Sequence, residues 1–198
     1  MSSLAAPRLA MIALALATGF GAAANDPNNL LDAPGRRASP SEIAAADITV
    51  FPDGSGLPTG RATAREGRLV YGQHCAACHG EKGQGNDDFP GLAGGVGSLS
   101  GGTPLLTVGS YWPYATTLWD YTRRAMPYPR PGSLTPQEVY AVTAYVLYLN
   151  GIVEEDLVLD QNTLPKVRMP NRDGFVPDPR HRRLIVLPAR DRRSKSVR

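Results

Sequence analysis

The residues most clearly able to carry out chemistry are Cys75, Cys78 and His79, in the sequence Cys75-Ala-Ala-Cys78-His79. The C-x-x-C-H pattern is a signal for covalent haem attachment, because two thiols can bond one porphyrin while the adjacent imidazole ligates its iron. On a helix, positions i and i+3 lie on one face, so both sulfurs can reach the same ring. These are the only 2 cysteines among 198 residues, so no thiol remains for a disulfide framework.

Two other interpretations of a C-x-x-C sequence fit this chain less well. A four-ligand zinc site needs further Cys or His residues, and neither His74 nor His181 has the paired spacing of zinc ligands. A thioredoxin-like redox pair is expected between alternating strands and helices, whereas the pattern around Cys75 is helical. There is no second C-x-x-C-H motif, and the sequence therefore predicts one covalently bound haem.

The second axial ligand is expected from a methionine. Met126 lies 47 residues after His79, in a predicted loop that would face the opposite side of the ring. Thioether ligation favours reduced iron and raises the reduction potential. We predict Met126 as the ligand. The alternatives are Met126 as ordinary core packing, ligation by Met169, His74 or His181, and an open iron site.

A glycine-rich stretch follows the motif. Residues 80–102 contain nine glycines and are predicted to form a loop whose backbone can approach a flat porphyrin closely. None of these glycines precedes the Lys-Ser or Lys-Thr of a phosphate-binding loop. Within this stretch, the Pro90 carbonyl oxygen is a candidate acceptor for the far nitrogen of His79. Such a bond orients the imidazole and raises its basicity as a ligand, and an ordinary loop proline is the alternative.

Three helices are predicted to position these residues. Capping boxes occur at Thr63-Ala-Arg-Glu66 and Thr135-Pro-Gln-Glu138. They predict one helix over about residues 64–74, which ends at the haem motif, and another that starts at Pro136 and stops at Asn150-Gly151. A helix over residues 114–125 is predicted between them. Its inward face has three-four spacing and consists of Ala115, Leu118, Trp119 and Thr122.

The N-terminal region is predicted to be a signal peptide over residues 1–24. Arg8 precedes an apolar run too short to span a bilayer, and Ala22-Ala23-Ala24 offers a small-residue cleavage site. An uncleaved anchor is the alternative. Export fits the motif, and we expect a periplasmic protein. Residues 25–60 are rich in Pro and Gly and are predicted to be a linker or a surface-hugging arm.

The rest of the chain is divided into a domain and two extensions. We assign residues 61–152 to the haem-binding domain, residues 153–179 to an extended segment that wraps the domain or contacts a partner, and residues 180–198 to a basic tail. Residues 25–179 carry 12 basic and 17 acidic side chains, whereas the tail carries 8 basic and 1 acidic. A solvated terminus is the simplest interpretation of the tail. Docking to an acidic partner or to anionic lipid is the alternative, and nucleic acid is not an expected partner.

Longer segments resemble a known family. The sequence from Tyr71 to Gly80, the Met126-Pro127 loop and the capped last helix resemble class I cytochromes c. The segments 107–121, 140–152 and 164–175 are similar to the cytochrome subunit of the Sox sulfane dehydrogenase and to related sulfite dehydrogenase cytochromes. This resemblance implies an all-α class I cytochrome c fold, with three main helices around one haem and extended terminal arms. It also implies that Cys75, Cys78, His79 and Met126 hold the haem.

The resemblance implies a function as well. We expect an electron-transfer subunit with no catalytic residues of its own, which accepts electrons from a molybdenum-cofactor sulfite or sulfane dehydrogenase and passes them to a downstream cytochrome. Two alternatives stay open. One is a freestanding monohaem shuttle that serves an oxidase or reductase, and the other is a haem sensor or catalyst with an open iron site.

Overall fold

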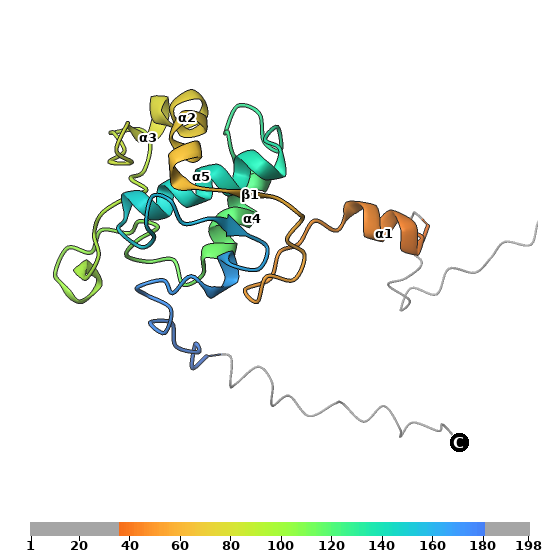
Figure 1. Cartoon of the computed structure of the whole chain (residues 1–198). Coiled ribbons are helices and arrows are strands. Elements are labelled where there is room, and N and C mark those ends of the chain that lie inside the picture. The colour runs from red at the N-terminus through yellow and green to blue at the C-terminus, as the bar shows by residue number, and fades with distance from the viewer. Residues whose placement is uncertain (1–35, 181–198) are drawn as a thin grey trace, which may run out of the picture. The chain divides into compact units, whose positions relative to one another are not determined.

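The computed structural model describes residues 36–180 (Figure 1). The predicted signal peptide and nearly all of the basic tail lie outside these residues. The described chain divides into two compact units, with the boundary after Ala46. The first unit contains helix α1, Pro40–Ala46, for which we had predicted no helix. Ser39 and Glu42 are nevertheless spaced as a capping box, and each accepts a hydrogen bond from the other's backbone N–H.

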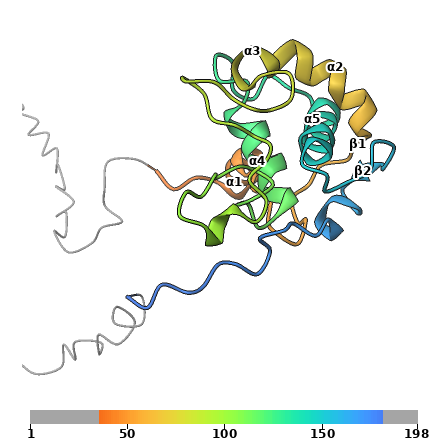
Figure 2. The ribbon, with the colours of Figure 1, turned by 90° about the vertical axis from the view of Figure 1, so that its left-hand side faces the viewer.

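The second unit is built on two helices that cross each other. Helix α2 spans Ala64–His74 and helix α5 spans Pro136–Leu149, and both begin with the predicted capping boxes. The two helices pack closely (Figures 1 and 2). Gly67 makes this approach possible, because a Cβ there would lie 1.9 Å from the backbone oxygen of Ala141. The packing therefore depends on the absence of a side chain at the crossing point.

Helix α4, Ala115–Ala125, packs against the same central helix. The predicted inward face is confirmed, since its four residues are all buried. The Trp119 ring lies 5.3 Å from that of Tyr140 on α5. The helix begins one residue later than predicted, because Tyr114 has an extended backbone and is the N-cap.

Both extensions of the second unit pack onto the helices. Strand β1, Arg61–Ala62, pairs antiparallel with strand β2, Leu159–Asp160, as Figure 2 shows beside α5. Residues 47–60 lie against the domain, where the Pro58 carbonyl oxygen accepts a 3.0 Å hydrogen bond from the Tyr140 hydroxyl. Burial raises the pKa of Tyr140 to about 12, so its hydroxyl stays protonated and remains a donor. The 3-10 helix η3, Leu164–Lys166, follows β2.

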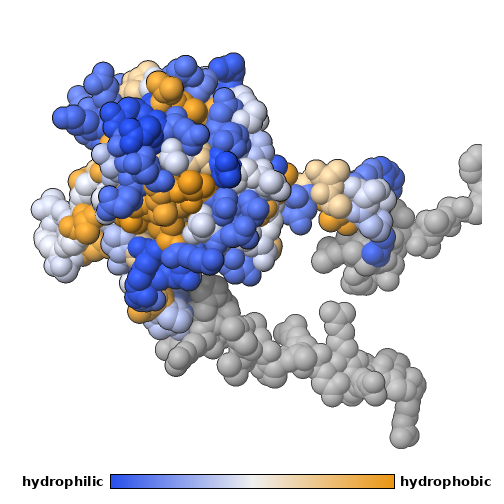
Figure 3. All heavy atoms as spheres, viewed as in Figure 1, coloured by the Kyte–Doolittle hydropathy of each residue, from blue (hydrophilic) through white to orange (hydrophobic). Residues whose placement is uncertain are grey.

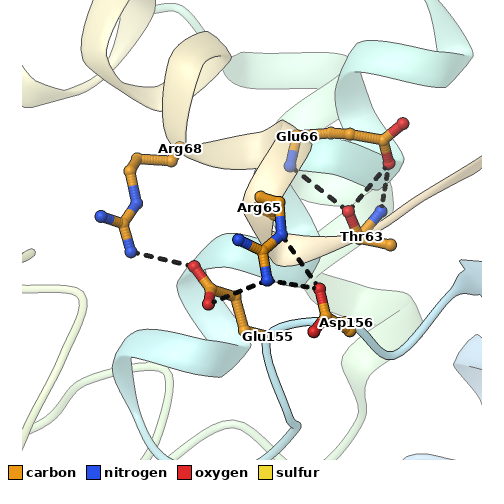
Figure 4. A network of polar contacts seen from close by, with 6 residues as sticks. All are labelled: Thr63, Arg65, Glu66, Arg68, Glu155 and Asp156. Carbon is orange, nitrogen blue, oxygen red and sulfur yellow. Dashed lines mark hydrogen bonds and ion pairs between the residues drawn. The ribbon is translucent and has the colours of Figure 1, made fainter.

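The start of α2 is tied to the segment that follows α5 (Figure 4). Arg65 contacts Asp156 at 2.8 Å and Glu155 at 3.5 Å, and Arg68 contacts Glu155 at 3.1 Å. Asp156 and both arginines are largely exposed, so this network orients the segment more than it stabilises the fold.

Figure 3 shows apolar residues gathered over α5 and the segment that follows it, with hydrophilic residues around them. Across residues 36–180, no helix is both long enough and apolar enough to span a membrane.

Candidate haem site

The two cysteines lie where one helix ends and another begins. Cys75 caps α2, with its backbone N–H bonded to Tyr71, and the short helix α3, Ala76–His79, starts directly after it. The Cys78 N–H donates to the Cys75 carbonyl oxygen at 3.2 Å, so the two residues remain one turn apart despite the joint. Both thiols are free and partly exposed. The turn thus presents two sulfurs at the spacing that the motif predicts.

Tyr71 fixes the C-terminal end of this turn. Its buried hydroxyl donates a 2.8 Å hydrogen bond to the Gly80 carbonyl oxygen, which closes the end of α3. Burial raises the pKa of Tyr71 well above its ordinary value, and the phenol therefore remains a donor. Burial, with a smaller contribution from Cys78, raises the pKa of the Cys75 thiol to about 11. In the chain without haem this thiol is therefore protonated at neutral pH.

His79 is nearly buried, with 9% of its surface exposed. Its Nδ1 lies 2.8 Å from the Pro90 carbonyl oxygen. Because a carbonyl can only accept, Nδ1 carries the proton and Nε2 is left with a lone pair for a metal. The contact that we anticipated from the sequence is therefore present in the structure. Phe89 lies beside the imidazole, with ring centres 6.4 Å apart.

Gly85 allows the loop to bring Pro90 to the histidine. The backbone of Gly85 has a φ of +74°, and a Cβ there would lie 2.5 Å from the Gly91 nitrogen. Its N–H donates to the His79 carbonyl oxygen at 2.7 Å. Only glycine meets both requirements without strain. The glycine-rich composition thus has a specific function at this position.

The two candidate methionines have different environments. Met126 caps the C-terminal end of α4 and is partly exposed at the start of the loop to α5. Met169 is only 1% exposed and belongs to the hydrophobic core, as does Leu164. The thioether of Met126 is therefore accessible to a group outside the core, whereas that of Met169 is enclosed.

The residues present fit a haem better than a bare metal ion. Within residues 36–180 no cluster of three or more His, Cys, Asp or Glu side chains could hold a metal ion. The loop that carries Pro90 leaves large apolar side chains exposed, namely Phe89, Val96, Leu99, Leu105 and Leu106. Two thiols, an imidazole and an apolar loop are the set of groups that a covalently attached porphyrin requires.

Asn150 has a function at this site that sequence reasoning missed. We predicted it only as the stop of the last helix. Its side chain donates to the Leu92 carbonyl oxygen at 3.1 Å and accepts from the Gly94 N–H at 3.1 Å. It therefore attaches the glycine-rich loop to α5. No sequence signal links residues 56 positions apart, so only the three-dimensional contact reveals this link.

Comparison with known proteins places the chain in a family. Residues 64–150 match the family model for cytochrome c. A chain in the crystal structure of the sulfane dehydrogenase SoxCD from Paracoccus pantotrophus is 42% identical, with a TM-score of 0.70 and a match that covers 83% of each chain. The protein is a class I c-type cytochrome.

Family membership supplies the cofactor and the general function. This cytochrome carries covalently bound haem c with iron and acts as an electron-transfer component. A curated relative, the CcoP subunit of a cbb3-type cytochrome c oxidase from Azospirillum sp. (strain B510), is 37% identical over 91 residues. That match covers 43% of this chain and spans only 30% of the length of the relative.

Proposed function

We propose that this cytochrome is a periplasmic monohaem subunit that accepts electrons from a molybdenum-cofactor sulfite or sulfane dehydrogenase and passes them to a downstream cytochrome. The observation that carries this proposal is the similarity to a sulfane dehydrogenase chain at 42% identity. That similarity covers 83% of this chain, well beyond residues 64–150 that match the general cytochrome c family. A match of that extent includes residues outside 64–150.

In this proposal four residues hold the haem. Cys75 and Cys78 would bond the haem covalently through their sulfurs, and His79 and Met126 would ligate its iron. When bound, the haem supplies reversible one-electron chemistry at its iron. The Pro90 carbonyl oxygen holds the proton of His79 on Nδ1 and thereby directs Nε2 to the metal. Substrate oxidation takes place on the partner, since this chain has only relay functions in the proposal.

The partly exposed Met126 can be tested as ligand against the buried Met169. We expect the oxidised Met126→Ala protein to lose the sulfur-to-iron charge-transfer band and to show a lower reduction potential, because it loses a thioether ligand. The matched control is Met169→Leu, which conserves volume in the core and should cost less than about 1.5 kcal/mol while the band remains. An unchanged band in Met126→Ala would refute the assignment.

The partner can be tested by isolation of the full-length holoprotein at low ionic strength. We expect it to co-purify with a molybdenum protein that oxidises sulfite or a sulfane-sulfur substrate and reduces this haem. Isolation as a fully active free carrier would instead establish the freestanding shuttle. Binding of carbon monoxide by the native reduced protein would indicate an open iron site and contradict Met126 ligation.

A further inference from the structure

One face of the second unit combines cations with aromatic rings, of which Tyr111 and Phe175 are exposed, and we call it the aromatic–basic face. It consists of Tyr111, Trp112, Phe175, Lys166, Arg168 and Arg172. Its two parts are firmly joined. The Asn171 side chain donates to the Tyr111 carbonyl oxygen at 2.8 Å, and the rings of Tyr111 and Phe175 meet edge to face at 5.1 Å.

The three cations are concentrated in one place. Lys166, Arg168 and Arg172 line a single surface hollow together with one carboxylate, Asp173. This concentration stands out because residues 47–180 carry 14 acidic and 11 basic side chains. Like charges repel, so the grouping of three cations costs free energy that an acidic partner would recover.

The nearby carboxylates neutralise this group only in part. Arg168 contacts Asp173 at 3.0 Å, but both side chains are about four-fifths exposed, so their pairing is weak and readily exchanged. Within the described residues Lys166 forms no ion pair. Arg172 lies over the Tyr114 ring, 4.4 Å from its centre, and points its charge at an aromatic face.

Two apolar hollows flank the cations. One, of about 200 Å³, is lined by Tyr111, Trp112 and Pro113. The other, of about 280 Å³, has apolar side chains from the segment after α5 and shares Lys166 and Arg168 with the basic hollow. Phe175 is 52% exposed and packs against Tyr111, which lines the hollow of about 200 Å³. Tyr, Trp and Arg are the residue types that dominate the binding energy of protein interfaces, and they do so when packed into apolar pockets.

We propose that the aromatic–basic face is the docking surface for the electron-donating partner, and that the partner presents an acidic surface with apolar side chains to it. This inference rests on the proposed function. The donor is the expected occupant because the cations belong to residues 166–172, outside residues 64–150 that match the general family. The similarity to the sulfane dehydrogenase chain covers far more of the sequence. The cationic part of the face thus lies outside the segment that matches the general family, which fits a partner specific to chains of this kind.

The test uses the full-length holoprotein and the molybdenum protein that co-purifies with it. The two are separated and recombined, and the dissociation constant is measured at graded ionic strength. We expect Lys166→Glu and Phe175→Ala each to weaken binding about tenfold or more. We also expect Lys166→Glu to reduce the salt dependence of binding, because one attractive charge pair is lost. The matched control is Arg61→Glu, which makes the same type of change at an exposed cation on β1.

The outcomes separate this inference from the proposed function. If no molybdenum protein accompanies the wild-type chain, both the proposed function and the docking surface are overturned. If the complex forms but Lys166→Glu and Phe175→Ala bind as tightly as wild type, only the docking surface is overturned. Equal weakening by Arg61→Glu would also overturn it, since net charge would then explain the effect. An unchanged haem spectrum and unfolding midpoint in each variant confirm that its fold is intact.

Discussion

The α2–α5 helix pair and the glycine-rich segment 80–110 both serve the Cys75–His79 motif, but different interactions hold them. The helix pair is stabilised by capping boxes and by a continuous buried stretch of α5, residues 139–147. The segment 80–110 has no helix apart from one short 3-10 turn. It is held by individual bonds such as that from the Thr107 hydroxyl to the Gly94 carbonyl oxygen, at 2.5 Å.

This difference indicates a division of function. The helix pair fixes where the thiols and His79 emerge, and it does so with interactions that are redundant and mostly apolar. The segment 80–110 delivers one carbonyl oxygen, that of Pro90, and leaves several large apolar side chains exposed, such as Val96 and Leu106, although Val108 is buried. We therefore expect the helix pair to withstand haem removal better than the segment, and variants can test the two regions separately.

The largest expected effect is a disruption of the helix pair at its crossing. In Gly67→Val, the new side chain would collide with the backbone of Ala141, which cannot rotate away. We expect a loss of about 3 kcal/mol or more in the free energy of unfolding, measured by denaturant titration of the holoprotein. The control is Gly72→Ala on the same helix, where no atom lies within 4 Å of the added Cβ. It should stabilise by up to about 1 kcal/mol, and equal losses in the two variants would contradict the crossing argument.

The second-largest effect is expected at Asn150, which links the helix pair to the segment 80–110. Asn150→Ala removes the bonds to Leu92 and Gly94 and a third to the Val146 carbonyl oxygen. We expect a cost of about 2–3 kcal/mol and faster hydrogen exchange at Gly94, while the amides in the middle of α5 stay protected.

The matched variant for this link is Asn150→Asp. It keeps the acceptor for the Gly94 N–H but loses both donor bonds, so exchange at Gly94 should stay slower than in Asn150→Ala. Equal acceleration of exchange in α5 and in the segment would show that the two regions open as one unit, which would remove the distinction between them.

A smaller effect is expected at the capping box of α5. Thr135→Ala should cost about 1 kcal/mol, and Thr135→Ser should restore most of it because the accepting oxygen is kept. Hydrogen bonds from Thr135 lower the pKa of Glu138 from its ordinary value of 4.5. This part of the stability is therefore present above pH 4.5 and declines as the pH falls through the lowered pKa. The backbone N–H of residue 135 makes the larger contribution and is kept in Thr135→Ala, so the difference between the two proteins in thermal unfolding should shrink in acid only by the hydroxyl's smaller contribution.

The smallest effect is expected in the exposed network of Figure 4. Asp156→Ala removes the closer of the two acidic partners of Arg65, but both side chains of this pair are largely exposed. We expect no measurable change in the unfolding midpoint at moderate ionic strength. A clear loss would mean that the segment after α5 contributes more to the stability of the helix pair than its surface contacts suggest.

The sequence by itself determined the local features of this cytochrome. The starts of α2 and α5 were predicted from capping boxes at Thr63 and Thr135, and the buried face of α4 from its periodicity. The thiol spacing of Cys75 and Cys78 likewise depends on one turn of chain. These features involve residues no more than about four positions apart, so composition and spacing suffice to specify them.

Only the tertiary structure decided how distant segments meet. Residues far apart in sequence meet in the strand pair of Ala62 with Leu159 and in the hydrogen bond between Asn150 and Gly94. The burial of Met169 likewise depends on distant parts of the chain. No local pattern encodes such partners, because they depend on how all the apolar surfaces are buried together. The physical reason is the range of the interactions, since caps and periodicity act within a helical turn whereas packing acts across the whole domain.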